Sequence, residues 1–224
     1  MISAPPVVAV ANVPFYSQFV DVDSAKWKKN SCGVVSIAMI VDYYSDKPIS
    51  VNTMLNQAIA SGAYLPSAGW THQGLINLSK KYGMTGKAYD LSSSSSKAAF
   101  ATFSTLLKDG PIIASVHYKF EPTNPIPHLV VIDGIDKDFV YYNDPASTGG
   151  GKKISVDTFR KAWKQKFIVI RPVKTQVAVA PVAPTVALTI KEHGVEEISA
   201  TNTSFFSSFF AFISSAWTSN KHIG

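Results

Sequence analysis

The sequence predicts an α+β fold in which helices come first and an antiparallel sheet follows. Between residues 31 and 108, apolar side chains recur at helical spacing. From residue 112 the pattern changes to short segments rich in Val, Ile and Tyr, which is typical of strands. Because these strands follow one another directly, the pattern favours antiparallel pairing over alternating βαβ units.

Four helices are expected before the sheet. The first begins at Ser31-Cys32 and stops before Lys47-Pro48, and its apolar positions predict a buried helix with Cys32 in the first turn. Thr71 is expected to cap the third helix, and the fourth ends at Asp109-Gly110-Pro111. The second, third and fourth helices are predicted over Val51–Ser61, His72–Tyr82 and Lys97–Lys108.

The sheet is expected to contain four strands, with one helix placed before the last of them. The helix is predicted over Ser155–Lys164, where Val156, Phe159 and Trp163 share a face. The strands are predicted over Ile112–Tyr118, His128–Ile135, Phe139–Asn143 and Lys166–Arg171.

The chain divides into four predicted parts. Residues 1–12 form a small, apolar N-terminal leader, and residues 13–172 form the globular domain. Residues 173–203 form an Ala/Val/Pro-rich linker, and residues 204–224 form an aromatic amphipathic helix. This helix has three readings: it docks back on the domain, lies in a membrane surface as a peripheral anchor, or binds a protein partner. Neither a signal peptide nor a transmembrane span is visible, and the compartment stays undetermined.

Composition excludes several classes of protein. The 224 residues are 46% hydrophobic and 16% charged, which supplies a buried core and excludes a disordered chain. A single cysteine excludes an internal disulfide and a Cys-rich zinc site. The net charge of +6 is spread over short pairs rather than one stripe, so no nucleic-acid partner is expected. The sequence contains no metal-binding or phosphate-binding motif, and no cofactor is expected.

Cys32 is a candidate nucleophile. It lies at the predicted N-terminus of the first helix, preceded by Asn30-Ser31 and followed by Gly33. The unpaired N–H groups and the positive dipole end of a helix favour thiolate over thiol, and the thiolate is the reactive form. A small buried core residue would give the same pattern.

His128 and Asp144 are candidate partners for that cysteine. His128 opens one strand and Asp144 follows the next. If Asp136-Lys137 forms the hairpin turn, residue 133 faces 140, 131 faces 142 and 129 faces 144. Asp144 would then lie diagonal to His128, where a carboxylate fixes the imidazole tautomer and stabilises its cation. His117 is the rival base, but it lacks a carboxylate on a paired strand.

Gln18, ahead of the cysteine, is a candidate oxyanion-hole donor. A side-chain amide beside the cysteine N–H can hold the oxygen of a tetrahedral intermediate. A polar residue after a short extended segment is ordinary in itself, so the amide gains meaning only together with the other candidates.

Several segments carry a resemblance to a known family. They are Val13-Pro14-Phe15-Tyr16-Ser17-Gln18, Cys32-Gly33 with the helix up to Asp42-Tyr43-Tyr44, Gly69-Trp70, His128-Leu129-Val130-Val131-Ile132-Asp133-Gly134 and Tyr142-Asn143-Asp144-Pro145. In this order, over about Val13 to Pro172, the chain resembles the C39-like cysteine peptidases of the papain-like clan. The resemblance implies a papain-like fold and a peptide or protein substrate. It also implies Cys32 as nucleophile, His128 as general base, Asp144 as orienting residue and Gln18 in the oxyanion hole.

Two alternatives to a peptidase remain open. An amide hydrolase or acyltransferase would use the same triad, because the thioester step is shared. A catalytically silent binding module is the other. The family commonly has Pro and small residues after Cys-Gly, where this chain has Val34-Val35-Ser36.

Overall fold

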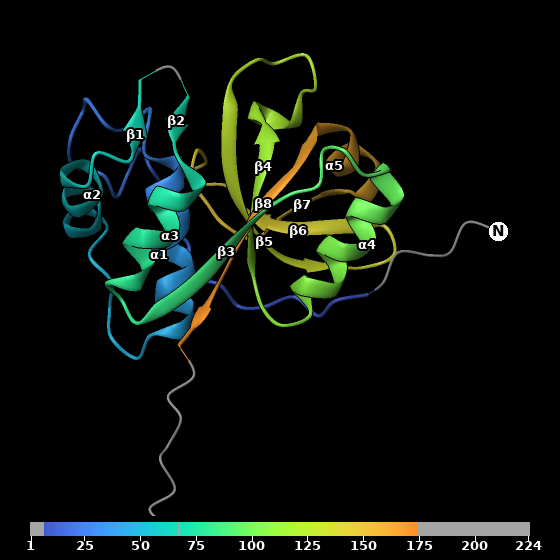
Figure 1. Ribbon diagram of the computed structural model, residues 1–224, viewed down its shortest axis with the longest axis horizontal. Coiled ribbons are helices and arrows are strands. Elements are labelled where there is room, and N and C mark those ends of the chain that lie inside the picture. Colours follow the sequence, from blue (N-terminus) through green and yellow to red (C-terminus); the bar gives the residue numbers. More distant parts are fainter. Residues whose placement is uncertain (1–6, 67, 174–224) are drawn as a thin grey trace, which may run out of the picture. The chain divides into compact units, whose positions relative to one another are not determined.

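The computed structural model describes residues 7–66 and 68–173 of the chain. These residues form two packed halves, one helical and one built on a curved sheet (Figure 1). The helical half contains α1 (Cys32–Tyr44), α2 (Val51–Ala60) and α3 (His72–Lys80). The other half carries α4 (Ser96–Leu107) and α5 (Val156–Ala162) on the sheet. The α+β prediction is confirmed.

The main sheet has six strands in the spatial order β3-β8-β4-β5-β6-β7, and every neighbouring pair is antiparallel. A short 3-10 turn, η1 (Tyr118–Phe120), follows β4. A separate two-stranded sheet pairs β1 (Tyr64–Leu65) with β2 (Gly69–Trp70) beside the helices. The strands of the main sheet are β3 (Met84–Asp90), β4 (Ile112–His117), β5 (Pro127–Ile135), β6 (Phe139–Asn143), β7 (Lys152–Ser155) and β8 (Trp163–Pro172).

Serine and threonine caps determine where four of the helices begin. The side chains of Ser50, Thr71, Ser95 and Ser155 each accept a hydrogen bond from the N–H three residues on, at the starts of α2, α3, α4 and α5. The exception is α1, whose N-cap Ser31 makes no such bond. The N–H groups in the first turn of α1 therefore have no side-chain cap competing for them.

The two central strands of the main sheet, β4 and β5, are buried on both faces, which explains their nearly unbroken apolar sequences. Alternate side chains of a strand point to opposite faces. Ile113, Leu129 and Val131 pack with α1, α2 and α3, whereas Ile112, Val130 and Ile132 pack with α4 and α5. Two hydrophobic cores thus lie on the two sides of one sheet.

The residues after Cys32-Gly33 belong to the first core. Val34 and Val35 have no exposed surface, and the Ser36 hydroxyl donates a 3.4 Å hydrogen bond to the Leu129 carbonyl. A Cβ on Gly33 would lie 2.9 Å from Leu75 Cδ1 and 3.1 Å from Leu129 Cδ1. The absence of a side chain on Gly33 therefore lets the start of α1 approach β5 closely, and the bulky residues that follow it point into the core.

The predicted register of the β5–β6 hairpin is wrong. Val131 pairs with Asn143 and Ile132 with Tyr142, and a bulge at Asp133 shifts the register before Gly134 pairs with Tyr141. The tight turn lies at residues 137–138, because the Asp136 N–H donates to the Phe139 carbonyl at 2.9 Å. Asp136 lies before the turn, where its carboxylate accepts bonds from the N–H groups of Asp138 and Phe139. A bulge adds one unpaired residue, which counting from a turn does not reveal.

Two strands of the main sheet were not predicted, and both lie at its edges. β3 and β7 each have only one neighbour in the sheet. Their side chains are mostly exposed or half-buried, so their sequences, Met84-Thr85-Gly86-Lys87-Ala88-Tyr89-Asp90 and Lys152-Lys153-Ile154-Ser155, lack a clear apolar alternation.

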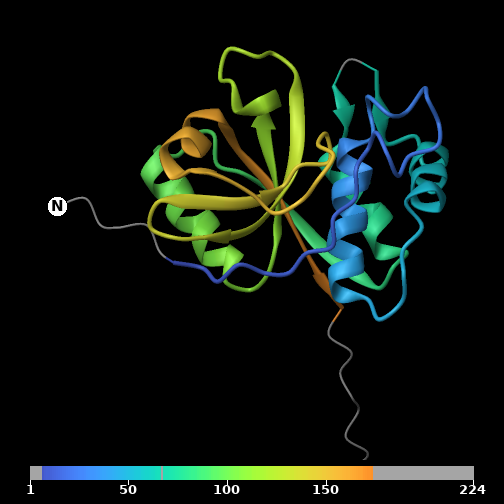
Figure 2. The same cartoon turned by 180° about the vertical axis from the view of Figure 1, so that it is seen from behind.

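The N-terminal segment runs along the sheet before it reaches the helices (Figure 2). Val8 and Ile135 exchange backbone hydrogen bonds of 2.6 and 3.1 Å, and the Ala11 N–H donates to the Asp133 carbonyl. The predicted linker (173–203), apart from Val173, and the predicted aromatic helix (204–224) lie outside the described residues. Among the helices in the described part of the chain, none has the length and apolarity needed to cross a membrane.

Candidate active site

Cys32 is the first residue of α1 and is half-buried. It lies at the positive end of the helix dipole, as the sequence pattern predicted. Helix α1 packs against β5, and the close contact at Gly33 brings the first turn of the helix to the beginning of that strand. The second residue of β5 is His128.

His128 and Asp144 are in direct contact. His128 Nε2 lies 2.6 Å from Asp144 Oδ1, and the imidazole is only 5% exposed. The same carboxylate oxygen accepts a 2.8 Å hydrogen bond from the Ala146 N–H. The ring of Tyr118 packs edge-on against His128 with centroids 5.2 Å apart. The imidazole is therefore held on one side by a carboxylate and on another by an aromatic ring.

The Cys32 thiol and the His128 imidazole line the same pocket, and each shifts the pKa of the other. Burial alone would raise the pKa of the Cys32 thiol, but its hydrogen bond with His128 and the charge of that imidazole lower the pKa below its ordinary value. Burial opposes the charge of His128 as well, yet hydrogen bonds with Asp144 and Cys32 raise the pKa of His128 to about 9. Because Asp144 engages Nε2, Nδ1 is the nitrogen left for the thiol. These shifts favour a thiolate and imidazolium pair at neutral pH.

Asp144 supplies the negative charge beside the imidazole of His128. Burial would raise the pKa of its carboxyl, but the hydrogen bond and positive charge of His128 lower that pKa below its ordinary value. The carboxylate thus stays ionised beside the imidazolium at neutral pH.

Gln18 is buried next to the loop that carries Asp144. Gln18 is 3% exposed, and its backbone N–H donates a 2.7 Å hydrogen bond to the Pro145 carbonyl. Within the described residues its side-chain Oε1 is buried without a hydrogen-bond partner. The structure therefore places Gln18 beside the residue after Asp144, and it records no hydrogen bond between the Gln18 amide and Cys32.

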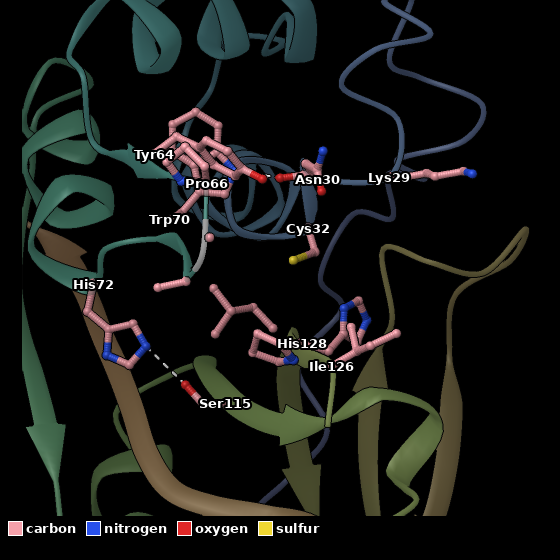
Figure 3. A pocket seen from close by; sticks show the side chains of 14 residues that line it. Lys29, Asn30, Cys32, Tyr64, Pro66, Trp70, His72, Ser115, Ile126 and His128 are labelled. Carbon is pink, nitrogen blue, oxygen red and sulfur yellow. Dashed lines mark hydrogen bonds between the residues drawn. The ribbon is translucent and has the colours of Figure 1, made fainter. Parts of the chain in front are cut away.

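A pocket of about 240 Å³ opens beside Cys32 and His128 (Figure 3). One wall is aromatic: the ring centroids of Tyr64 and Trp70 are 5.2 Å apart, and Trp27 packs behind them at 5.0 and 5.6 Å. Trp70 Nε1 donates a 2.6 Å hydrogen bond to the Asn30 carbonyl, two residues before the cysteine. The pocket wall and the segment leading into Cys32 are thus joined.

Two further pocket residues were not predicted as functional. His72 Nε2 and Ser115 Oγ lie 3.0 Å apart in the pocket, and Ser115 is 8% exposed. His72 was predicted only as the first residue of the third helix. The available signal was Ser115 itself, a lone hydroxyl inside the apolar strand Ile112–His117. His117, the rival base, instead contacts the Asn124 carbonyl through Nδ1 at 2.8 Å.

A second hollow of about 440 Å³ contains the other buried carboxyl, Asp133, together with Asn143 and the N-terminal segment. Asn143 Nδ2 donates to Asp133 Oδ2 at 3.0 Å. Across residues 7–66 and 68–173, no group of three or more His, Cys, Asp or Glu side chains is arranged to hold a metal ion.

Comparison with known proteins gives one family and several relatives. The family model described as the Peptidase_C39 like family matches residues 10–167. The pediocin PA-1 transport/processing ATP-binding protein PedD of Pediococcus acidilactici is 27% identical over 150 residues. That alignment covers 66% of this chain but only 18% of the relative, so the chain spans about a fifth of that protein.

Two solved structures share the fold. One is a double glycine motif protease from an AMS/PCAT transporter in complex with the leader peptide, with 23% identity and a TM-score of 0.51 over 75% of this chain and 98% of that one. The other is described as a C39-like peptidase from Bacillus anthracis, with 23% identity and a TM-score of 0.53 over 75% and 100% of the two chains.

Proposed function

The chain belongs to the Peptidase_C39 like family, a family of cysteine peptidases, and we propose that Cys32, His128, Asp144 and Gln18 perform its hydrolysis of peptide bonds. The observation that carries this proposal is the 2.6 Å contact between Asp144 and His128, in the pocket that also contains Cys32 at a helix N-terminus. A nucleophile, a base and a group that orients the base are the three parts that covalent hydrolysis requires.

The first half of the reaction forms an acyl-enzyme. The Cys32 thiolate attacks the carbonyl carbon of the scissile bond, and the oxygen of the resulting tetrahedral intermediate accepts hydrogen bonds from the Cys32 N–H and the Gln18 amide. The imidazolium of His128 gives its proton to the leaving amine as the C–N bond breaks. A thioester on Cys32 and a free amine are the products of this half.

Water completes the reaction. His128, now neutral, accepts a proton from the water molecule that attacks the thioester, and the C–S bond breaks to release the carboxylic acid. Asp144 holds the imidazole through Nε2, so that Nδ1 faces the reacting atoms in both halves. The thiolate and imidazolium are restored at the end of the cycle.

We propose an extended peptide segment as the substrate. The pocket beside Cys32 is narrow, with a volume of about 240 Å³, and it has an aromatic wall on one side. The names of two relatives concern processing and a leader peptide, which supports a peptide substrate for this chain. For those relatives the peptidase domain is one part of a transport system, and only the peptidase part is shared.

A defined peptide mixture, derived from a proteome by trypsin, tests the proposed function. The wild-type protein and Cys32→Ser are incubated with it, and new peptide ends are identified by mass spectrometry. We expect new ends only with the wild type, while Cys32→Ser retains the same circular dichroism spectrum and melting temperature. Added amines report whether the acyl-enzyme passes to water or to an amine, since aminolysis products would indicate an acyltransferase.

The single cysteine supplies an independent readout in the same samples. Every cysteine adduct of iodoacetamide must lie on Cys32, and peptide mapping separates it from slower adducts on other side chains. Rapid alkylation at pH 6 together with new peptide ends supports the proposal. Slow alkylation and no new ends would contradict it and leave a binding module as the better description.

A further inference from the structure

The pocket beside the proposed catalytic group contains a second polar pair that the mechanism does not use. His72 and Ser115 come from α3 and β4, and they lie in the same pocket as Cys32 and His128 (Figure 3). The two side chains are joined by a 3.0 Å hydrogen bond between Nε2 and Oγ. Polar groups inside a mostly apolar pocket are the usual source of orientation and specificity for a ligand.

Lys166 and Asp90 are charged groups near this pair, and within the described residues the pocket itself has no acidic side chain. The pocket-lining side chains that can carry positive charge are Lys29 and the two histidines, and Lys29 extends away from the pair (Figure 3). Behind the pair, Lys166 on β8 is the cross-strand neighbour of Ser115, and its Nζ lies 2.9 Å from Asp90 Oδ2. Asp90, at the end of β3, is thus the carboxylate near His72, and it forms an ion pair with Lys166.

The pair can present a hydrogen-bond donor to a carboxylate. When Nε2–H of His72 donates to Ser115 Oγ, the hydroxyl proton is free to point at a ligand. Burial, and to a smaller extent the charge of Lys166, lower the pKa of His72 below its ordinary value, so the imidazole is neutral in the free enzyme at neutral pH. An anion bound beside it would draw a proton onto the ring and strengthen both hydrogen bonds.

We propose that His72 and Ser115 form a specificity subsite that accepts an acidic side chain of the peptide substrate, at a position close to the scissile bond. The inference rests on the proposed peptidase function and names the substrate class for that same site. A Lys or Arg at this position would find no carboxylate in the pocket to pair with it, and the charge of Lys166 acts on His72 from nearby. An amide such as Gln would match the size of Glu without its charge.

A matched set of peptides tests the subsite. The cleavage sites found for the wild type provide a parent peptide, from which versions with Glu, Gln or Lys are made at each position flanking the cut. We expect one position at which the wild type prefers Glu over Gln by about 10-fold in kcat/KM, as a charge-assisted hydrogen bond gives, and cleaves the Lys peptide most slowly. Lowering the pH from 8 to 5.5 should increase the Glu preference, because a bound carboxylate favours the protonated form of His72 and lower pH increases that form.

Three variants separate the subsite from a structural role. His72→Leu and Ser115→Ala should each bring the Glu to Gln ratio close to one and remove its pH dependence. The control His117→Gln alters a histidine on the same strand as Ser115 that is not among the pocket residues, and it should keep the ratio. If His72→Leu fails to fold, Ser115→Ala still decides, since it removes only one hydroxyl.

The outcomes distinguish the two proposals. A wild type that cleaves peptides without favouring Glu at any position, or a Glu preference that survives both His72→Leu and Ser115→Ala, overturns the subsite and leaves the peptidase proposal intact. A wild type that cleaves no peptide overturns the proposed function, and the subsite falls with it.

Discussion

His128 Nε2 and Asp144 Oδ1 lie 2.6 Å apart although a bulge at Asp133 changes the register between β5, which carries His128, and β6, which ends just before Asp144. The contact survives because Asp144 follows the end of β6, where its side chain can turn toward β5 without the constraint of strand pairing. The Ala146 N–H, which donates to the same oxygen, fixes the carboxylate in this orientation. The loop after β6 is therefore as important to the contact as the strands are.

Asp144→Asn should lower kcat by about 100-fold or more while KM changes little, because general acid–base catalysis by a correctly oriented imidazole contributes on this scale. Loss of the carboxylate charge should also lower the pKa of His128 from about 9, so the alkaline limb of activity moves to lower pH. Steady-state kinetics across pH on a peptide substrate measure both effects.

Asp136→Asn is the matched control for that variant. Asp136 also accepts hydrogen bonds at the β5–β6 hairpin, from Tyr141 and two backbone N–H groups, but it lies outside the pocket. The Asp136→Asn variant should therefore retain the wild-type kcat and pH profile. Equal losses in the two variants would point to a general weakening of the hairpin rather than to an oriented imidazole.

The pH dependence of Cys32 reactivity follows from the two coupled shifts. The pKa of Cys32 is lowered and that of His128 is raised to about 9, so the thiolate and imidazolium coexist between those two values. Alkylation of Cys32 should persist well below the ordinary thiol range, and hydrolysis should fall again as pH rises through about 9. In His128→Ala, burial is the main remaining influence and should raise the pKa of Cys32, which moves the alkylation curve to higher pH. An identical curve in both proteins would contradict the ion pair.

The pair formed by His128 and Asp144 should also affect folding stability. The pKa of His128 is raised in the folded state, so its stabilising effect is present at pH below 6.5 and is lost as pH rises through about 9. The pKa of Asp144 is lowered, so its effect is present above pH 3.8 and is lost as pH falls below that value. Both contributions are present together between these limits, near pH 4 to 6.5.

Gln18→Ala should reduce kcat by about 100-fold with a small effect on KM, as removal of one oxyanion-hole donor does. Gln18→Glu has the same size but places an acceptor where the oxyanion forms, so it should reduce kcat at least as much. Both variants keep the Gln18 N–H bond to the Pro145 carbonyl, which involves only the backbone. A fall in stability without a specific fall in kcat would assign Gln18 to packing alone.

Sequence reasoning worked best where one physical constraint dominated. The helix starts at Ser50, Thr71, Ser95 and Ser155 have local capping signals, and the buried strands around Ile113 and Val131 are apolar because both faces are covered. Edge strands such as β3 have no such constraint and were missed. At the bulge the Asp133 carbonyl accepts a hydrogen bond from the Ala11 N–H, and a contact between segments so far apart along the chain leaves no local pattern.

The same distinction applies to the site. Cys32 and His128 became candidates through their order along the chain with Asp144 and Gln18 and through the family resemblance, because each of them alone would also fit a structural role. Ser115 and His72 become notable only when β4 and α3 meet in one pocket, since each is ordinary in its own segment. Predicting such a pair requires the tertiary arrangement and not only the pattern along the chain.

Trp70→Phe should lower the free energy of unfolding by about 1 kcal/mol, the usual contribution of one hydrogen bond. Loss of its 2.6 Å bond to the Asn30 carbonyl also loosens the segment before Cys32, so kcat/KM should fall by up to about 10-fold. Trp163→Phe is the control, because Trp163 Nε1 donates to the Lys166 carbonyl at 3.2 Å in the other core. Urea denaturation and peptide kinetics should show similar stability losses in both variants and a rate loss only in Trp70→Phe.

Asp133→Asn should remove a pH-dependent weakness from the fold. Burial raises the pKa of Asp133 from 3.8 to about 7, so its contribution to stability is present below pH 3.8 and is lost as pH rises through about 7. Asn cannot ionise, yet its side-chain oxygen can still accept the bond from Asn143. Relative to wild type, the variant should therefore gain about 2–4 kcal/mol between pH 4 and pH 8, at 1.36 kcal/mol for each unit of pKa shift.

Urea denaturation at both pH values measures the gain. The control is Asp138→Asn, which changes an exposed carboxylate of the same hairpin and should show no gain. A stability difference that stays constant with pH would mean that Asp133 is ionised in the fold and held by a group that Asn cannot engage.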